Sequence, residues 1–154
     1  MSRSIYASIA AIPGLVVLAV GGRSHASGAQ AVWQADVRVQ SLTVEVRGKQ
    51  LSARAVIYSD NDDDARATRV EFLLPVGVGV LRVPARCEAS SSAVAGLHAR
   101  VTCQLGDVEV RGRREVQVVT TAVGSGPTAR FAVFVTSDTP DPAPANNYAE
   151  RAVP

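Results

Sequence analysis

The sequence predicts an all-β protein: an immunoglobulin-like Greek-key β-sandwich of seven or eight strands, preceded by a helical signal peptide. Three observations lead to this prediction. From about residue 36 onward, apolar and polar residues alternate with a period of two, which is typical of half-buried strands. Turn-forming residues separate the alternating runs, and no run after residue 31 has a convincing helical period. The length from residue 32 to residue 154 suits one immunoglobulin-like domain of about 100 residues with slightly long loops.

The first 31 residues differ in kind from the rest. Arg3 precedes an apolar run over 5–20, and small residues follow at Ser24-His25-Ala26 and Ala29-Gln30-Ala31. This order predicts a secretory signal peptide over 1–31, cut after Ala26 or Ala31. The alternative, an uncleaved anchor, is less favoured because Pro13-Gly14 interrupts a run already short for a span of about 20 residues. We expect a secreted product, periplasmic or extracellular, with no membrane span after cleavage.

The charge balance changes when the leader is removed. The whole chain has 16 Lys and Arg against 14 Asp and Glu, and two arginines, Arg3 and Arg23, lie in the leader. Cleavage after Ala31 therefore leaves equal numbers of each sign. A nucleic-acid-binding protein needs a basic face to displace counterions from the phosphates, so the sequence does not favour nucleic acid as a partner.

Two cysteines, Cys87 and Cys103, are present. An even number of cysteines in an exported chain predicts a disulfide, because that compartment allows the bond to persist. Closing a loop of this length contributes about 3 kcal/mol in the chain-entropy model. The alternative is a metal site, but His98 is the only histidine after the leader, and two Cys with one His lack the fourth ligand of a closed zinc site. The disulfide is the favoured interpretation, and no cofactor is predicted.

The alternating runs follow one another in a regular order. In the first run, the apolar parity switches near Gln40-Ser41, which predicts a β-bulge or a strand that changes sheets. Gly48-Lys49 predicts a turn, Pro75 ends the third run, and 124–127 predicts a turn before the penultimate strand. The expected extended segments are 36–47, 51–57, 69–74, 76–83, 99–105, 108–122, 131–135 and 148–153.

The closing stretch holds Pro140, Pro142 and Pro144, followed by Asn146-Asn147. The prolines remove three backbone donors and favour extended geometry, so this segment is neither a helix nor a central strand. We expect a stiff crossover that carries the chain from one sheet to the other. The asparagines suit its end because their side chains bond the local backbone and tolerate left-handed geometry. A disordered tail is the alternative, but alternation resumes after the asparagines.

Several short motifs stand in a fixed order: Ala35-Asp36, Leu74-Pro75-Val76-Gly77, Cys87, Val101-Thr102-Cys103-Gln104-Leu105-Gly106, Gly112 before Val116-Gln117-Val118, Asp141-Pro142, and Asn146-Asn147. In this order the chain resembles, from Ala35 to Val153, the extracellular β-sandwich repeat of bacterial and archaeal surface proteins known as domain of unknown function eleven. One position departs from that pattern: Asn61-Asp62-Asp63 has Asp where the family usually has Gly. The resemblance implies an immunoglobulin-like fold and a place at the cell surface.

Groups that could carry catalysis are few. A hydrolase needs a nucleophile, a base and an orienting group within bonding reach, and His98 would be its only histidine. No nucleophile elbow, zinc-protease motif or phosphate loop is present. We therefore expect no enzyme. The leading hypothesis is a non-catalytic secreted module with a structural, adhesive or protein-interaction role, whose protein partner lies at the cell envelope or extracellular surface. Pairing at an exposed sheet edge is the expected contact mode.

Two charged segments leave an alternative open. The acidic loop, Asp60-Asn61-Asp62-Asp63-Asp64, offers oxygen ligands of the kind that calcium prefers, although its spacing does not match the calcium-loop pattern. The arginine run, Arg111, Arg113 and Arg114, could contact an anion, although such a run is more often an exposed hairpin edge. The alternative function is thus a small secreted ligand-binding protein for calcium or an acidic glycan, using the acidic loop or the arginine run.

Overall fold

The computed structural model describes residues 33–90, 99–122 and 129–153, and these residues belong to one compact unit. The predicted signal peptide, its cleavage sites, His98 and the turn expected at 124–127 lie outside the described residues. Within the described ranges, no helix is long and apolar enough to cross a membrane.

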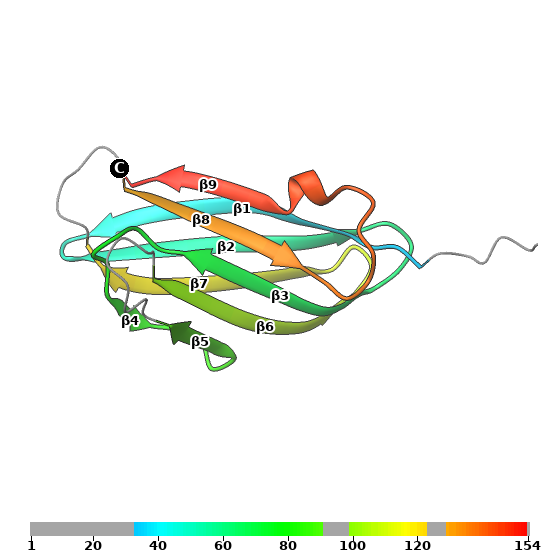
Figure 1. Ribbon diagram of the computed structural model, residues 1–154, viewed down its shortest axis with the longest axis horizontal. Helices are drawn as coiled ribbons and strands as arrows, with labels where there is room; N and C mark the ends of the chain where they lie inside the picture. The colour runs from blue at the N-terminus through cyan, green and yellow to red at the C-terminus, as the bar shows by residue number, and fades with distance from the viewer. Residues whose placement is uncertain (1–32, 91–98, 123–128, 154) are drawn as a thin grey trace, which may run out of the picture. The chain divides into compact units, whose positions relative to one another are not determined.

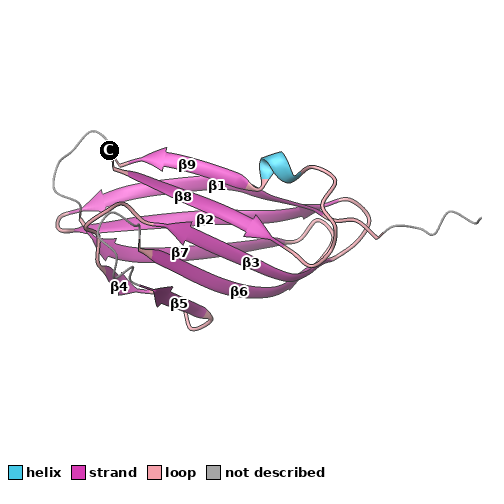
Figure 2. Ribbon diagram, viewed as in Figure 1, coloured by secondary structure: helices cyan, strands magenta, loops and turns pink. Residues whose placement is uncertain are grey.

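The described chain folds into two antiparallel sheets, which confirms the predicted sandwich (Figures 1 and 2). One sheet has four strands in the order β1-β2-β7-β4, and the other has five in the order β5-β6-β3-β8-β9. The strands are β1 (Asp36–Arg47), β2 (Gln50–Asp60), β3 (Ala65–Leu73), β4 (Val80–Arg82), β5 (Cys87–Ser90), β6 (Arg100–Val108), β7 (Arg113–Thr121), β8 (Arg130–Thr136) and β9 (Tyr148–Ala152).

The described residues thus contain nine strands, where the sequence predicted seven or eight. The additional strand is β5, which has only 4 residues and lies outside every predicted extended segment. β4, with 3 residues, falls within the predicted segment 76–83. Each of the two pairs with a single neighbour at a sheet edge, and β5 is too short to show a clear alternation in the sequence. The chain changes sheets between β2 and β3, β3 and β4, β4 and β5, β6 and β7, and β7 and β8.

The core lies between the two sheets and follows the predicted alternation. On β2 the buried residues are Leu51, Ala53, Ala55 and Ile57, and equivalent alternation buries Phe72 on β3 and Phe131 on β8. Full burial of a large apolar side chain contributes roughly 1.5–3 kcal/mol, so these residues hold the sheets together. The parity switch in β1 is a register shift between Val39 and Ser41, as predicted, and it returns Leu42 to the core.

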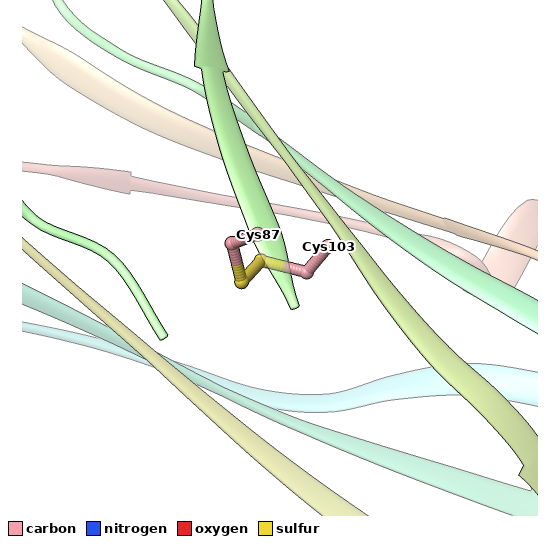
Figure 3. The surroundings of a disulfide bond; sticks show 2 residues. All are labelled: Cys87 and Cys103. Carbon is pink, nitrogen blue, oxygen red and sulfur yellow. A yellow bond between two sulfur atoms is a disulfide. The ribbon is translucent and has the colours of Figure 1, made fainter. Parts of the chain in front are cut away.

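A disulfide joins β5 to β6 through Cys87 and Cys103, which lie directly opposite each other in the ladder (Figure 3). Their Cα atoms are 4.0 Å apart. Cys103 is buried in the core and Cys87 is half-buried against it. The bond therefore links the short edge strand β5 covalently to β6, which contributes buried residues to the core.

The expectation that the proline-rich stretch crosses between the sheets is wrong. β9 pairs with β8 in the same sheet, in register from Phe134 opposite Tyr148 to Arg130 opposite Ala152. The stretch instead forms the loop that connects the antiparallel neighbours β8 and β9. This loop contains the 3-10 helix η1 (Pro144–Asn146) and lies against the start of β1. It turns back because polar groups hold it there. Asn147, with φ of −78°, does not use left-handed geometry.

These polar groups form a latch, which we define as Asp36, Asp141, Asn146 and Asn147 together with the β1 backbone. The Asp141 carboxylate accepts hydrogen bonds from the backbone N–H of Val37 (3.1 Å), from the backbone N–H of Ala143 (2.7 Å) and from Asn147 Nδ2 (3.0 Å). Asn146 Nδ2 donates to Asp36 Oδ1 at 2.8 Å. The latch thus joins the return before β9 to the first strand of the opposite sheet.

Candidate functional site

The acidic loop between β2 and β3 serves mainly to hold neighbouring backbone. Asp63 Oδ2 accepts a hydrogen bond from the Gln34 N–H at 2.9 Å, and Asp64 Oδ1 accepts one from the Val110 N–H at 2.9 Å. Asp60 caps its own loop through the Asn61 N–H at 3.0 Å. Backbone N–H groups need such acceptors when no strand partner is available. The carboxylates therefore point at separate segments.

The geometry of this loop also accounts for its departure from the family pattern. The residue with a positive φ is Asn61, at 72°, a conformation that Asn adopts more readily than most residues. Asp63 does not have a positive φ, and its side chain is used as an acceptor. Asp therefore takes the place of the expected Gly without backbone strain.

A pocket of about 370 Å³ lies beside the acidic loop. It is lined by Trp33, Asp62, Asp63, Asp64, Arg66, Asp138, Thr139 and Pro140. In the part of the chain that the structure describes, no three Asp, Glu, His or Cys side chains are grouped so that they could hold a metal ion. A calcium site would have to displace carboxylates that already bind backbone N–H groups.

The arginine run lies in the β6–β7 turn and at the start of β7. Arg111 has a φ of 57° in the turn. The Arg114 guanidinium folds back to donate to the carbonyl oxygens of Arg113 (3.1 Å) and Asp107 (3.3 Å). The turn is bound to the acidic loop through Asp64, so the two charged segments lie at one end of the sandwich. Of the three arginines, Arg114 therefore has its guanidinium occupied by backbone carbonyls.

The four edge strands of the two sheets differ in length and in how far their backbone is occupied. The edge strands β4 and β5 are short, and short edges resist edge-to-edge pairing. On β1, the Leu42 carbonyl accepts a hydrogen bond from Arg151 Nε at 3.2 Å, and the Val37 N–H donates to Asp141. Pairing of a partner strand at a sheet edge stays a prediction.

The outer face of the five-stranded sheet is a different kind of surface. Phe134 on β8 and Tyr148 on β9 lie opposite each other in register and are 38% and 44% exposed. Their ring centroids are 4.8 Å apart and the rings are tilted by 41°. We call this surface the aromatic face and define it as Arg69, Glu71, Leu73, Arg100, Ala132, Phe134, Thr136 and Tyr148. These residues alternate with the core residues of β3, β6, β8 and β9.

A hollow of about 440 Å³ lies on this face beside Phe134. Its lining residues are Arg69, Glu71, Leu73, Arg100, Phe134 and Thr136. Arg100 Nε and Glu71 Oε1 form an ion pair at 3.0 Å. The Arg69 guanidinium makes no ion pair or hydrogen bond within the described residues, although it lies in the centre of the sheet between β6 and β8.

Beside Tyr148, the charged residues Glu150 and Arg130 pair with each other. Glu150 Oε2 accepts a hydrogen bond from the Tyr148 hydroxyl at 2.9 Å, and Glu150 Oε1 lies 3.5 Å from Arg130 Nη1. The hydrogen bond to Glu150 raises the pKa of Tyr148 above its ordinary value, with slight burial and the carboxylate charge acting in the same direction, while Arg130 opposes them.

This face was not predicted from the sequence, in which the charged loop residues are more conspicuous. A signal was present in the penultimate strand. Phe131, Val133 and Val135 mark the buried parity of β8, so Phe134 falls on the parity that points away from the core. A large aromatic residue at an outward position is the observation that would have drawn attention to this surface.

No protein-family model matches the sequence, and no curated protein is significantly similar to it. Among solved structures, the chain is similar to the chitin-binding domain of Chi18aC from Streptomyces coelicolor, with 12% identity and a TM-score of 0.44 over 71% of this chain and 95% of that chain. It is also similar to a cohesin module of a family 33 glycoside hydrolase from Clostridium perfringens, with 14% identity and a TM-score of 0.38 over 75% and 96% of the two chains.

A family GH18 chitinase from Chromobacterium violaceum is similar at 17% identity and a TM-score of 0.36, over 79% of this chain but only 19% of the chitinase. All three similarities are too distant to transfer a function. The function is therefore inferred below from the residues of the aromatic face alone.

Proposed function

We propose that this protein is a non-catalytic, exported interaction module that makes its contact through the aromatic face. Its role is structural or adhesive, in the cell envelope or outside the cell. The observation that carries the proposal is the exposed Phe134–Tyr148 pair beside an open hollow on a sheet surface. Exposed aromatic residues are enriched at binding surfaces because they bury much area at a low cost in conformational entropy.

The arrangement of the charged groups supports the same proposal. At the loop end of the sandwich, Asp63, Asp64 and Asp141 accept backbone hydrogen bonds and stabilise the fold. On the aromatic face, by contrast, Arg69 and the Thr136 hydroxyl have no hydrogen-bond partner within the described residues. Side chains that the fold does not use are available to a ligand. The disulfide supports export, because such bonds persist in oxidising compartments.

The test uses the full chain expressed with its own leader and purified from the exported fraction. After fluorescent labelling, its binding to isolated envelopes of the producing cells is measured for the unchanged protein and for the double variant Phe134→Ser/Tyr148→Ser. The control is Val46→Ser/Leu81→Ser, which removes two similarly exposed apolar residues (44% and 51%) from the four-stranded sheet.

We expect the aromatic double variant to lose at least about tenfold in affinity, because truncation of a central aromatic contact typically costs more than 1 kcal/mol per residue. The control should bind like the unchanged protein, and circular dichroism should show both variants folded. Equal binding by all three proteins would contradict the proposed surface.

A further inference from the structure

We propose that the aromatic face binds an acidic sugar, and this inference rests on the proposed function. Arg69 receives the carboxylate, the rings of Phe134 and Tyr148 lie against the apolar face of the sugar, and Thr136 with the Glu71–Arg100 pair meets its hydroxyl groups. The ligand class is therefore a uronate-containing polysaccharide of the envelope or its surroundings.

Charge complementarity points to an acid. The hollow is lined by two guanidinium groups and one carboxylate, and Arg100 is already paired with Glu71 at 3.0 Å. Arg69 is left as a cation without a partner in the described residues. A guanidinium presents two parallel N–H donors that match the two oxygens of a carboxylate, and such bonds are about twice as strong as those between neutral groups. A neutral ligand would leave this donor pair unused.

The apolar part of the face points to a ring. Phe134, Tyr148, Leu73 and Ala132 adjoin one another across β3, β8 and β9, because Leu73 pairs with Ala132 and Phe134 with Tyr148. Sugar rings carry C–H groups on their faces and hydroxyls around their rims. Such a ring can cover the aromatic side chains while its hydroxyls, which both donate and accept, reach polar groups beside them.

The backbone of this face argues against a peptide as the ligand. β3 lies between β6 and β8, and β8 lies between β3 and β9, so both strands have neighbours on each side. Their N–H and C=O groups are used in ladders and are unavailable to a ligand. Peptides that bind to sheets usually gain affinity from main-chain hydrogen bonds at an edge. A sugar has no main chain to satisfy and needs only side chains.

The test is calorimetric titration of the exported protein with oligogalacturonate, oligomannuronate and hyaluronan fragments. For the uronate that binds best, the fully methyl-esterified form is titrated as well, because esterification keeps the ring and removes the charge. Variants are Arg69→Gln and Phe134→Ser. The matched control is Arg54→Gln, which removes an exposed guanidinium from the outer face of the opposite sheet.

We expect at least one uronate to bind. Its affinity should fall about tenfold on esterification and in Arg69→Gln, the loss expected from removing one charged hydrogen-bond pair. It should also fall about tenfold in Phe134→Ser, because that variant removes an aromatic contact with the sugar ring. Arg54→Gln should change it less than twofold. Failure of all three uronates to bind would overturn the inference, as would equal affinity for acid and ester or equal binding by Arg69→Gln.

These outcomes separate the inference from the function on which it rests. A protein that binds neutral glycans or an envelope protein through Phe134, without dependence on Arg69, would disprove the acidic sugar and leave the aromatic face as the contact surface. Envelope binding that is insensitive to Phe134→Ser/Tyr148→Ser would remove both.

Discussion

We predict that the fold depends on the side chain of Asp141 in the latch. Its carboxylate accepts three hydrogen bonds, one from the Val37 N–H on β1, one from the Ala143 N–H and one from Asn147 Nδ2. Replacement by Ala removes both acceptor oxygens, and with them all three hydrogen bonds, and leaves a β1 donor without a partner. At about 1 kcal/mol for each bond, Asp141→Ala should lower the free energy of unfolding by roughly 3 kcal/mol.

The matched control for this prediction is Asp138→Ala. Asp138 lies in the same connection between β8 and β9, and its side chain has no hydrogen bond within the described residues, whereas its backbone N–H, which Ala retains, donates to the Arg66 carbonyl. Exposed substitutions of this kind usually change stability by less than about 0.5 kcal/mol. Both variants exchange Asp for Ala in the same irregular segment. The difference between their unfolding free energies therefore reports the hydrogen bonds of the Asp141 carboxylate.

Urea unfolding followed by circular dichroism measures the difference. For a domain of this size, 3 kcal/mol corresponds to a fall in Tm of roughly 10 °C, which a thermal scan should also show. If Asp141→Ala and Asp138→Ala unfold at the same urea concentration within error, the latch does not stabilise the fold and the reasoning from its hydrogen bonds is refuted.

Three further predictions concern other parts of the fold. Gly112→Ala should destabilise by about 1–3 kcal/mol, because its Cβ would lie 2.6 Å from the Glu109 carbonyl oxygen, whereas Gly79→Ala, with its nearest contact at 3.6 Å, should unfold near the unchanged protein; equal urea midpoints would contradict this. Reduction of the disulfide should cost about 3 kcal/mol, and a thiol assay on the unfolded, unreduced protein should find no free sulfhydryl; a free thiol would disprove the bond. Glu150→Gln should lower the raised pKa of Tyr148 in a spectrophotometric titration, because it removes the carboxylate that accepts a hydrogen bond from the phenol O–H, and an unchanged titration would rule out that hydrogen bond as the cause.

Much of the fold could be predicted because burial leaves a period-two pattern in the sequence. The alternation around Leu51, Ile57, Phe72 and Phe131 marks the inward parity of each strand, and the parity switch marks the bulge in β1. The same pattern says little about which strands are neighbours. The final strand therefore looked as though it belonged to the other sheet, although it pairs with β8.

The candidate site was harder to predict for the same physical reason. Phe134 and Tyr148 are neighbours only because β8 and β9 pair in one register. Outward positions are not constrained by the core, so no periodicity marks them. By contrast, the acidic loop and the arginine run were conspicuous in the sequence, but the fold uses Asp60, Asp63, Asp64 and Arg114 to bind backbone groups.

The motifs that carry the family resemblance have a structural explanation. Asp36, Asp141, Asn146 and Asn147 meet in the latch, although they come from opposite ends of the domain. Gly112 lies where a Cβ would contact the backbone. These residues thus contact backbone or one another within the sandwich. Kinship with the surface-protein repeat stays a prediction, which a structure of such a repeat with the same latch would support.

We propose that ligand contact occurs on the outer surface of the five-stranded sheet. The most direct measurement is a two-dimensional amide NMR spectrum of the isotope-labelled protein, recorded during titration with oligogalacturonate and with solubilised envelope material. The largest shifts should fall on Arg69, Leu73, Phe134 and Tyr148, with β2 and β7 unchanged. Shifts confined to the four-stranded sheet or to the acidic loop would contradict it.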